Sequence, residues 1–295
     1  MNTAEIDARE YPFAAHWQAL DAGRMHYVDE GPRTGEVVLC LHGNPTWSFF
    51  YRRLVLGLCD TRRVIAPDHI GCGMSDKPAG WSYTLTAHIE NLEALVLALD
   101  LRRITLVLHD WGGAIGMGLA RRHPERIARL VILNTAAFRS SAMPWRIRVC
   151  RTPLLGGFLV QRMNAFAGLA TRMAVARAPL TRSAREGLLA PYRSSHERVA
   201  IRRFVEDIPT TPAHPSWPEL EAIESSLARF AALPACIVWG ERDWCFTPRF
   251  REEWMRRFPL AEVHKLEGAG HYLLEDAFLE VQACVREFLT RHPLA

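Results

Sequence analysis

The sequence predicts an α/β fold, with a mostly parallel central sheet flanked by helices and an inserted helical cap. Short apolar runs alternate along the chain with segments of helical periodicity, as in βαβ units. Most of these runs carry apolar residues on both faces, which suits parallel strands covered by helices. The alternation stops between about 136 and 229, where no strand-like run occurs. A chain of 295 residues, 49% of them hydrophobic, is long enough for one such elaborated domain.

Six apolar runs account for the expected strands, and one long segment accounts for an expected helix. The helix is predicted over 83–101, with Thr86 as its N-cap. Its apolar side chains recur at the spacing of one helical face: Ile89, Leu92, Leu95, Val96 and Leu99. The predicted strands are 36–43 (EVVLCLHG), 63–68 (RVIAPD), 104–110 (ITLVLHD), 129–134 (RLVILN), 235–240 (ACIVWG) and 261–268 (AEVHKLEG).

The chain is expected to divide into a sheet-containing core and a cap inserted within it. We place the core at 1–135 and 230–295 and the helical cap at 136–229. Within the cap, the stretch 136–185 holds no Asp or Glu but many arginines. Such a stretch is typical of a solvated face with buried arginine stems, and it also fits an anionic partner or a membrane surface.

Composition and charge argue against several classes of protein. The net charge of +4 gives little support for a nucleic-acid partner, so none is expected. No stretch reaches the roughly 18 apolar residues of a membrane span, and the polar N-terminus is unlike a signal peptide. The seven cysteines form no CxxC pair, which predicts free thiols and a cytoplasmic location. No cluster of His, Cys and carboxylates has metal-ligand spacing, and we expect neither a metal nor a cofactor.

The segment LVLHDWGG (106–113) places an acidic residue at the tip of a strand-to-helix turn. An apolar strand-like run leads into Asp110, and Gly112 and Gly113 follow. This is the pattern of a nucleophile elbow, with a departure at Leu108, where a glycine usually stands. Serine is the usual nucleophile at such a tip, and an aspartate taken alone also suits a helix N-cap.

Two further residues complete a catalytic order. Asp243 follows a strand-like run in VWGERDWCFTP (238–248), and His271 lies in the glycine-rich LEGAGHYLLED (266–276). The order nucleophile, acid, histidine is that of the α/β-hydrolase triad. We therefore predict an α/β-hydrolase fold in which Asp110, Asp243 and His271 are catalytic.

An aspartate at the elbow indicates chemistry different from that of a serine esterase. A carboxylate is already ionised at neutral pH, so it can displace a leaving group from an sp³ carbon and form an alkyl ester. His271 then activates water, and Asp243 orients His271. Asn44, in the loop after the first predicted strand, and Trp111 offer N–H groups to a leaving or bound anion. Local packing would also account for each of these two residues.

Four segments together resemble the haloalkane dehalogenases over nearly the whole chain: HGNPTWSFFYRRL (42–54), PDHIGCGMSDKP (67–78), HDWGG (109–113) and GAGHYLLED (268–276). The position of Asp243 is similar to that of the acid in the third dehalogenase subfamily, which includes the β-lactone decarboxylases of bacterial long-chain olefin biosynthesis. Five shorter segments resemble that decarboxylase branch: NTAAF (134–138), MPW (143–145), NAF (164–166), APY (190–192) and RFVEDIP (203–209). The resemblance implies the following roles: nucleophile Asp110, base His271, acid Asp243, and anion-stabilising pair Asn44 and Trp111.

The resemblance leaves two reactions open for one site. In a dehalogenase, Asp110 displaces halide from a haloalkane, Asn44 and Trp111 hold the halide, and water releases an alcohol. In the decarboxylase, a cis-3,4-dialkyl β-lactone (an oxetan-2-one) loses CO2 and gives a cis-alkene, and the same two donors would hold the departing carboxylate. The apolar segment 154–175 suits long alkyl chains and so favours the decarboxylase, although core packing accounts for it equally well. A small hydrophobic substrate is expected in either case.

Other classes of protein fit the sequence less well. Epoxide hydrolases also carry an elbow aspartate, but they need two cap tyrosines, and this cap has only Tyr192. An ordinary esterase requires serine in place of Asp110. A receptor or scaffold on this fold commonly lacks a triad member, whereas all three are present here. The olefin enzymes of the resemblance work in multi-enzyme assemblies, so the arginine-rich stretch 136–185 is a candidate docking surface for such partners.

Overall fold

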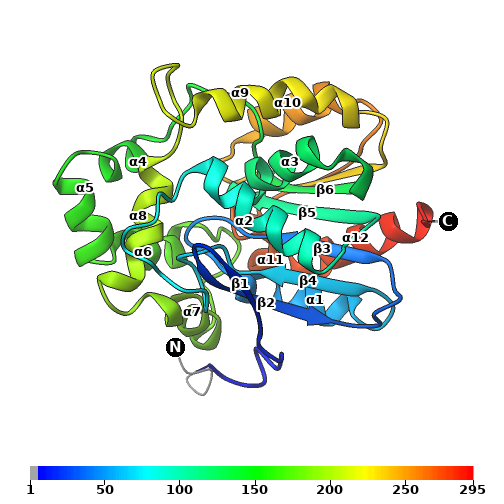
Figure 1. Ribbon diagram of the computed structural model, residues 1–295, viewed down its shortest axis with the longest axis horizontal. Helices are drawn as coiled ribbons and strands as arrows, with labels where there is room; N and C mark the ends of the chain where they lie inside the picture. Colours follow the sequence, from blue (N-terminus) through cyan, green and yellow to red (C-terminus); the bar gives the residue numbers. More distant parts are fainter. Residues whose placement is uncertain (1–5, 295) are drawn as a thin grey trace.

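One eight-stranded sheet forms the centre of the molecule (Figure 1). The computed structural model describes residues 6–294. The strands lie in the order β1-β2-β4-β3-β5-β6-β7-β8; β2 is antiparallel to β1 and β4, and the other neighbours are parallel. They span β1 (His16–Leu20), β2 (Gly23–Glu30), β3 (Val37–Leu41), β4 (Arg63–Pro67), β5 (Ile104–Asp110), β6 (Ile127–Thr135), β7 (Ala235–Gly240) and β8 (Glu262–Leu266).

All six predicted strands are present, with small shifts at their ends. The edge strands β1 and β2 are not predicted from the sequence. In β1 the side chains alternate between partly buried and exposed, so no apolar run marks the strand. In β2 the buried positions include the polar residues His26 and Asp29, which interrupt the expected apolar pattern. The sequence therefore predicts the parallel part of the sheet and misses its antiparallel edge.

The helix predicted over 83–101 is α2 (Leu85–Ala98), and its predicted N-cap is wrong. The N-cap is Thr84, whose extended backbone precedes the helix and whose hydroxyl accepts a hydrogen bond from the backbone N–H of Ala87. Thr86 lies inside the first turn instead. The carboxylate of Asp207 also caps this end, because its Oδ2 accepts from the backbone N–H of Leu85 at 2.7 Å.

Helices cover both faces of the sheet, and each layer packs on alternate residues of the strands. Leu106 of β5 belongs to the core on one face, whereas its neighbour Val107 belongs to the core on the other. The first layer contains α2, α3 (Trp111–Arg122), α9 (Trp217–Ser226) and α10 (Pro248–Arg257). The second contains α1 (Arg52–Leu58), α11 (Leu273–Asp276) and α12 (Phe278–Arg291), with the short helix η2 (Ser48–Tyr51). A further short helix, η3 (Pro124–Arg126), joins α3 to β6.

The described residues between 136 and 229 contain helices and turns but no strand. Most of these helices lie beyond one end of the sheet, on the left of Figure 1. They are α4 (Trp145–Cys150), α5 (Leu155–Gly157), the π-helix η4 (Phe158–Arg162), α6 (Ala165–Met173), α7 (Arg182–Leu189), η5 (Ala190–Tyr192), η6 (His196–Arg198) and α8 (Val199–Glu206). The last two helices of this range, α9 and η7 (Leu227–Phe230), instead join the first core layer through Leu220, Ile223, Leu227 and Phe230.

Hydrogen bonds join this helical segment to the loops at the end of the sheet. The backbone N–H of Tyr272 donates to the carbonyl of Ala174 at 2.8 Å. The indole N–H of Trp244 donates to the carbonyl of Met173, also at 2.8 Å. The C-terminal end of α6 is therefore fixed beside two loops of the core. Among residues 6–294, no helix is long and apolar enough to cross a membrane.

Candidate active site

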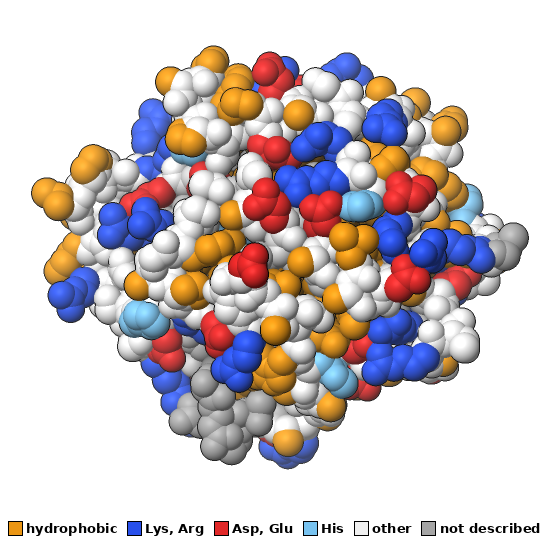
Figure 2. Space-filling model, in the orientation of Figure 1, with side chains coloured by type: hydrophobic (Ala, Val, Ile, Leu, Met, Phe, Trp, Pro, Cys, Tyr) orange, Lys and Arg blue, Asp and Glu red, His pale blue; other side chains and the backbone are white. Residues whose placement is uncertain are grey.

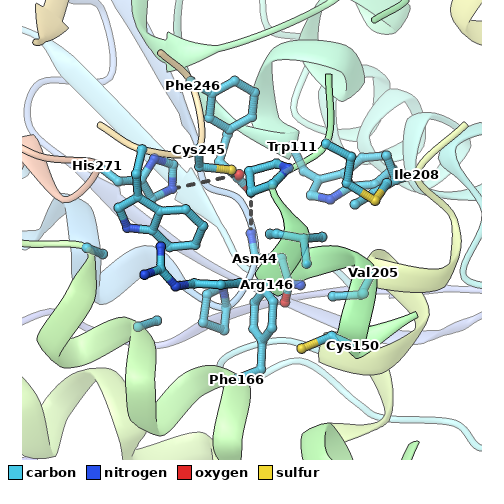
Figure 3. A pocket seen from close by; sticks show the side chains of 18 of the residues that line it. Asn44, Trp111, Arg146, Cys150, Phe166, Val205, Ile208, Cys245, Phe246 and His271 are labelled. Atoms are coloured by element: carbon cyan, nitrogen blue, oxygen red, sulfur yellow. Dashed lines mark hydrogen bonds and ion pairs between the residues drawn. The ribbon is translucent and has the colours of Figure 1, made fainter. Parts of the chain in front are cut away.

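A cavity of about 450 Å³ lies between the end of the sheet and the helical segment. Asp110, Asn44, Trp111 and His271 all line it. Figure 3 shows Asn44, Trp111 and His271 around one part of the cavity, with Phe166 on the side contributed by α6. The rest of the lining is mainly apolar and includes Phe138, Ile147, Leu159, Phe166, Leu169, Met173, Val205, Ile208, Phe246 and Phe250. Such a lining suits a hydrophobic molecule with one reactive polar group.

The turn at Asp110 has the backbone conformation of a strained elbow. Asp110 ends β5 with φ +51° and ψ −126°, a conformation that a residue with a side chain rarely adopts. Neighbouring glycines make the turn possible, because a Cβ on Gly112 would collide with the carbonyl of Leu41 and one on Gly113 with the hydroxyl of Thr135. That hydroxyl donates a hydrogen bond to the carbonyl of Asp110. The elbow therefore exposes the Asp110 carboxylate to the cavity.

The Asp110 carboxylate is held from two sides. Its Oδ1 accepts a hydrogen bond of 2.6 Å from the backbone N–H of Asn44, and its Oδ2 lies 3.7 Å from Nε2 of His271. Gly43 leaves room for this contact, since a Cβ at that position would collide with the carboxylate. Burial raises the pKa of Asp110 above its ordinary value, while His271 and the backbone N–H of Asn44 oppose that rise.

His271 is oriented by the acid predicted for it. Its Nδ1–H donates to Oδ2 of Asp243 at 2.8 Å, which leaves Nε2 directed towards Asp110. Burial works to lower the pKa of His271, but the negative charges of Asp243 and Asp110 outweigh burial and raise it. The backbone carbonyl of His271 also accepts a 2.9 Å hydrogen bond from Nε2 of His109. The structure thus brings the three predicted triad residues together.

Asn134 supports the acid and is not predicted from the sequence. Its side-chain amide donates to Oδ2 of Asp243 at 3.0 Å and to the carbonyl of Gly240 at 3.1 Å. Its Oδ1 accepts from the backbone N–H of Gly240 at 2.8 Å. The backbone N–H groups of Cys245 and Phe246 occupy the other oxygen of Asp243. A polar residue at the end of the apolar run RLVILN is the signal that could have identified Asn134.

The predicted anion-stabilising pair, Asn44 and Trp111, lies beside Asp110. The side-chain NH2 of Asn44 donates to the carbonyl of Ile201 in α8 at 3.1 Å, so one of its two N–H groups is already used. The Trp111 ring lies with its centroid 5.2 Å from that of Phe204, also in α8. Both residues line the cavity, and their role towards an anion stays a prediction.

One group of possible metal-binding side chains occurs away from this cavity. Ligand atoms of Cys236, Glu262 and His264 lie within 4.8 Å of one another on β7 and β8. Glu262 already pairs with Arg291 and with His292, and burial raises the pKa of the Cys236 thiol, which disfavours the thiolate that a metal requires. None of the three lines the cavity, and we assign them no part in the site.

Similar proteins are found among enzymes that act on lactones and haloalkanes. The chain is 46% identical to a cis-3-alkyl-4-alkyloxetan-2-one decarboxylase of Shewanella oneidensis, over 95% of this chain and 89% of that protein. It is 43% identical to a decarboxylase of the same name from Xanthomonas campestris, over 92% of this chain and 93% of that protein. Identity to haloalkane dehalogenase 2 of Mycobacterium tuberculosis is 31%, over 95% of this chain and 96% of that protein.

Solved structures and the family profile agree with these relatives. The crystal structure of a haloalkane dehalogenase from Bradyrhizobium elkani USDA94 superposes with a TM-score of 0.87 and 26% identity, covering 95% of this chain and 98% of that one. Residues 36–278 match the sequence profile of the family described as the alpha/beta hydrolase fold. Its sequence identity to the two cis-3-alkyl-4-alkyloxetan-2-one decarboxylases is higher than its identity to the haloalkane dehalogenase. The chain therefore belongs to the α/β-hydrolase fold family, with these decarboxylases and dehalogenases as relatives.

Proposed function

We propose that the protein decarboxylates cis-3,4-dialkyl β-lactones (oxetan-2-ones) to cis-alkenes and CO2 in long-chain olefin biosynthesis. Two relatives named cis-3-alkyl-4-alkyloxetan-2-one decarboxylase match nearly the whole chain, at 46% and 43% identity. The observation that carries the proposal is a buried carboxylate, Asp110, at the base of a mainly apolar cavity. Such a cavity can take two alkyl chains while presenting one ionisable group to the ring between them.

The first step is attack by Asp110 on the ring carbon that bears the oxygen. An oxygen of Asp110 forms a bond to this sp³ carbon as the ring C–O bond breaks, which gives an alkyl ester and a free substrate carboxylate. Asn44 and Trp111 lie where they can donate hydrogen bonds to that carboxylate. Attack from the side opposite to the ring oxygen leaves the new C–O bond antiperiplanar to the neighbouring carbon–carboxylate bond.

In the second step the ester eliminates instead of being hydrolysed. The electron pair of the carbon–carboxylate bond forms the C=C bond, CO2 departs, and the bond between Asp110 and carbon breaks to restore the carboxylate. Inversion followed by anti-elimination keeps the two alkyl chains cis, and no water is consumed. A positive charge on His271, 3.7 Å from Asp110, would favour the departing carboxylate.

Haloalkane dehalogenation is the alternative for the same site. Dehalogenases are among the relatives, and their crystal structures superpose closely on this chain. In that reaction Asp110 displaces halide, and His271 takes a proton from water as the water cleaves the ester. The two reactions share the first bond to Asp110 and differ in the fate of the ester. Epoxide hydrolysis is disfavoured further, because the hydroxyl of Tyr192 is buried, donates to the carbonyl of Thr46 and does not line the cavity.

A paired assay on the purified chain tests the proposal. One arm supplies a long-chain cis-β-lactone and measures alkene by gas chromatography; the other supplies short bromoalkanes and measures bromide. We expect rapid alkene formation that disappears in Asp110→Ala, with little bromide. Rapid bromide release without alkene would contradict the decarboxylase and establish the dehalogenase. Asp110-independent activity in either arm would contradict both.

A cytoplasmic location and association with other olefin-biosynthesis enzymes accompany this proposal. The seven cysteines are all free in the structure, as in proteins of a reducing compartment. Co-purification with the pathway partners tests the association, and its loss on reversal of several arginine charges in 136–185 would support that stretch as the contact.

A further inference from the structure

Exposed hydrophobic side chains concentrate on one part of the cap. In the described chain they gather on α4, α5, η4 and α6, where the side chain of Leu154 is 90% exposed and that of Trp145 is 67% exposed. The others are Leu155, Phe158, Met163 and Leu169. Figure 2 shows hydrophobic side chains projecting at the end of the molecule where α5 lies in Figure 1, with Lys or Arg side chains beside them. Large hydrophobic side chains grouped in this way mark an interaction surface.

Unpaired arginines share this part of the surface, which we call the α4–α6 face. Arg148, Arg162 and Arg172 are exposed and form no ion pair with any residue of 6–294. Arg146 lies over the rings of Trp145 and Trp244 instead of beside a carboxylate. Two other arginines of the same stretch differ, because Arg139 pairs with Glu221 and Glu224, and Arg177 pairs with Glu280. With no Asp or Glu between 136 and 185, α4, α5, η4 and α6 contribute only positive charge, whereas Glu186 of α7 and Glu206 of α8 pair with Arg182 and Arg202 of their own helices.

The mouth of the cavity lies on the same face. Trp145 and Leu169 line the cavity and are also exposed, so the cavity reaches the surface between α4 and α6. Leu154 and Phe158 are exposed beside it without lining it. A molecule that leaves a bilayer contacting this face could therefore reach the cavity without crossing water.

We propose that the α4–α6 face binds an anionic lipid surface, with its apolar side chains in the headgroup boundary and its arginines on lipid phosphates. Apolar side chains flanked by arginines are the combination that holds a protein at such an interface. Each arginine near an anionic bilayer strengthens binding by about fivefold. A second copy of the chain is a poorer partner, since the unpaired arginines of two such faces would repel each other. Delivery of a water-insoluble substrate through this face rests on the proposed function; binding to lipid does not.

Vesicle flotation of the full chain tests the proposal without requiring turnover. We expect the protein to float with vesicles of phosphatidylcholine mixed with phosphatidylglycerol, at least tenfold more tightly than with phosphatidylcholine alone. The double variant Leu154→Asp/Phe158→Asp should lose at least tenfold in binding. Its matched control, Leu260→Asp/Leu279→Asp, places the same charges at exposed leucines of the core and should bind as wild type. Arg148→Glu/Arg162→Glu should abolish the preference for anionic vesicles, whereas Arg229→Glu/Arg249→Glu should keep most of it.

Several results would overturn the proposal. These are an absence of flotation, equal binding to both vesicle types, or equal losses in the cap variants and their controls. A dimer in solution that Leu154→Asp/Phe158→Asp converts to monomer, without vesicle binding, would make the face a contact between copies. Capture of a protein partner by the same arginines, again without vesicle binding, would make it a protein docking surface. Unchanged turnover of a short, water-soluble substrate by the variants shows that they are folded.

Discussion

The core of the molecule and its cap organise their side chains in opposite ways. In the core, Asp110 ends the fully buried strand β5 and Asp243 follows the fully buried strand β7, and a backbone N–H group donates to an oxygen of each carboxylate. In the cap, the segment 154–175 is broken into a short helix, a π-helix and α6, and many of its apolar side chains face solvent. The core therefore fixes the reacting atoms, while the cap shapes the space that decides which molecules reach them.

The largest effect should follow from removal of the nucleophile in the core. We expect Asp110→Asn to lower alkene formation by about 10⁴-fold, because the amide cannot form the ester to the substrate. The variant keeps an acceptor for the backbone N–H of Asn44, so the fold should persist. Gas chromatography of the alkene and thermal unfolding are the measurements. Asp21→Asn, a matched change at an exposed aspartate, should leave both unchanged; activity of Asp110→Asn near the wild-type level would refute the assigned nucleophile.

A smaller loss of turnover is expected when Asp243, which accepts a hydrogen bond from His271, is replaced by asparagine. In Asp243→Asn an amide nitrogen would face Nδ1 of His271 and the amide of Asn134, placing donors against donors. His271 should turn or change tautomer and lose the charge that favours its protonated form, so turnover should fall by about 10²-fold. Steady-state kinetics with long and short substrates measure the loss. Because the change lies in the core, turnover of the long and the short substrate should fall equally. A loss of turnover confined to long substrates would contradict the assignment of the chemistry to the core and of substrate selection to the cap.

The pH dependence of the reaction rate should be set by core residues and should not vary with the substrate chain that the cap contacts. Burial raises the pKa of Asp110, so the carboxylate becomes protonated, and no longer nucleophilic, at a higher pH than an ordinary aspartate. Below that pKa the rate should fall about tenfold for each pH unit. A pH–rate profile recorded with a long and a short substrate should give the same acid limb for both. An acid limb at the ordinary pKa of aspartate would indicate that the site is more hydrated than the structure implies.

The smallest and most selective effect should come from the cap. Ala170 lines the cavity from α6, and Ala170→Phe should fill space that a long alkyl chain uses. We expect a loss in kcat/KM of about fourfold for each methylene that the ring displaces, and little loss for a short substrate. Ala178→Phe, at an exposed position outside this cavity, is the matched control. Equal losses for long and short substrates would show that Ala170 affects the reacting atoms instead of chain length.

The difference between core and cap also explains what the sequence could predict. Buried parallel strands carry apolar residues on both faces, so β5 and β7 are predicted to the residue, and Asp110 at the end of β5 and Asp243 after β7 are located with them. The antiparallel edge escapes prediction because β1 alternates between partly buried and exposed side chains and β2 buries polar residues. Asn134 escapes because its role depends on partners distant in sequence, such as Gly240. The N-cap of α2 is missed by two residues, since either Thr84 or Thr86 could cap a helix locally.

In the cap, local sequence says little about which side chains line the cavity. Leu159 and Phe166 line it and are partly buried, whereas Leu154 and Phe158, in the same apolar segment, face solvent. The π-helix η4 shifts the helical register within this segment, and Asn164 starts α6 from a left-handed conformation with φ +54°. A single helical period therefore does not run through 154–175, and apolar composition alone cannot separate lining from exposed residues.

The hydrogen bond from Tyr272 to Ala174 has a consequence for how such enzymes diversify. The backbone N–H that follows His271 donates to a carbonyl of the cap, and a Cβ on Gly270 would lie 2.7 Å from that carbonyl oxygen. A cap transplanted from a relative would need a carbonyl at the same place, or the histidine loop would lose a support. Exchange of whole caps is thus constrained at this joint. New substrate ranges should arise instead by substitutions on α4, which lines the cavity with Trp145, Ile147 and Val149, with the end of α6 retained.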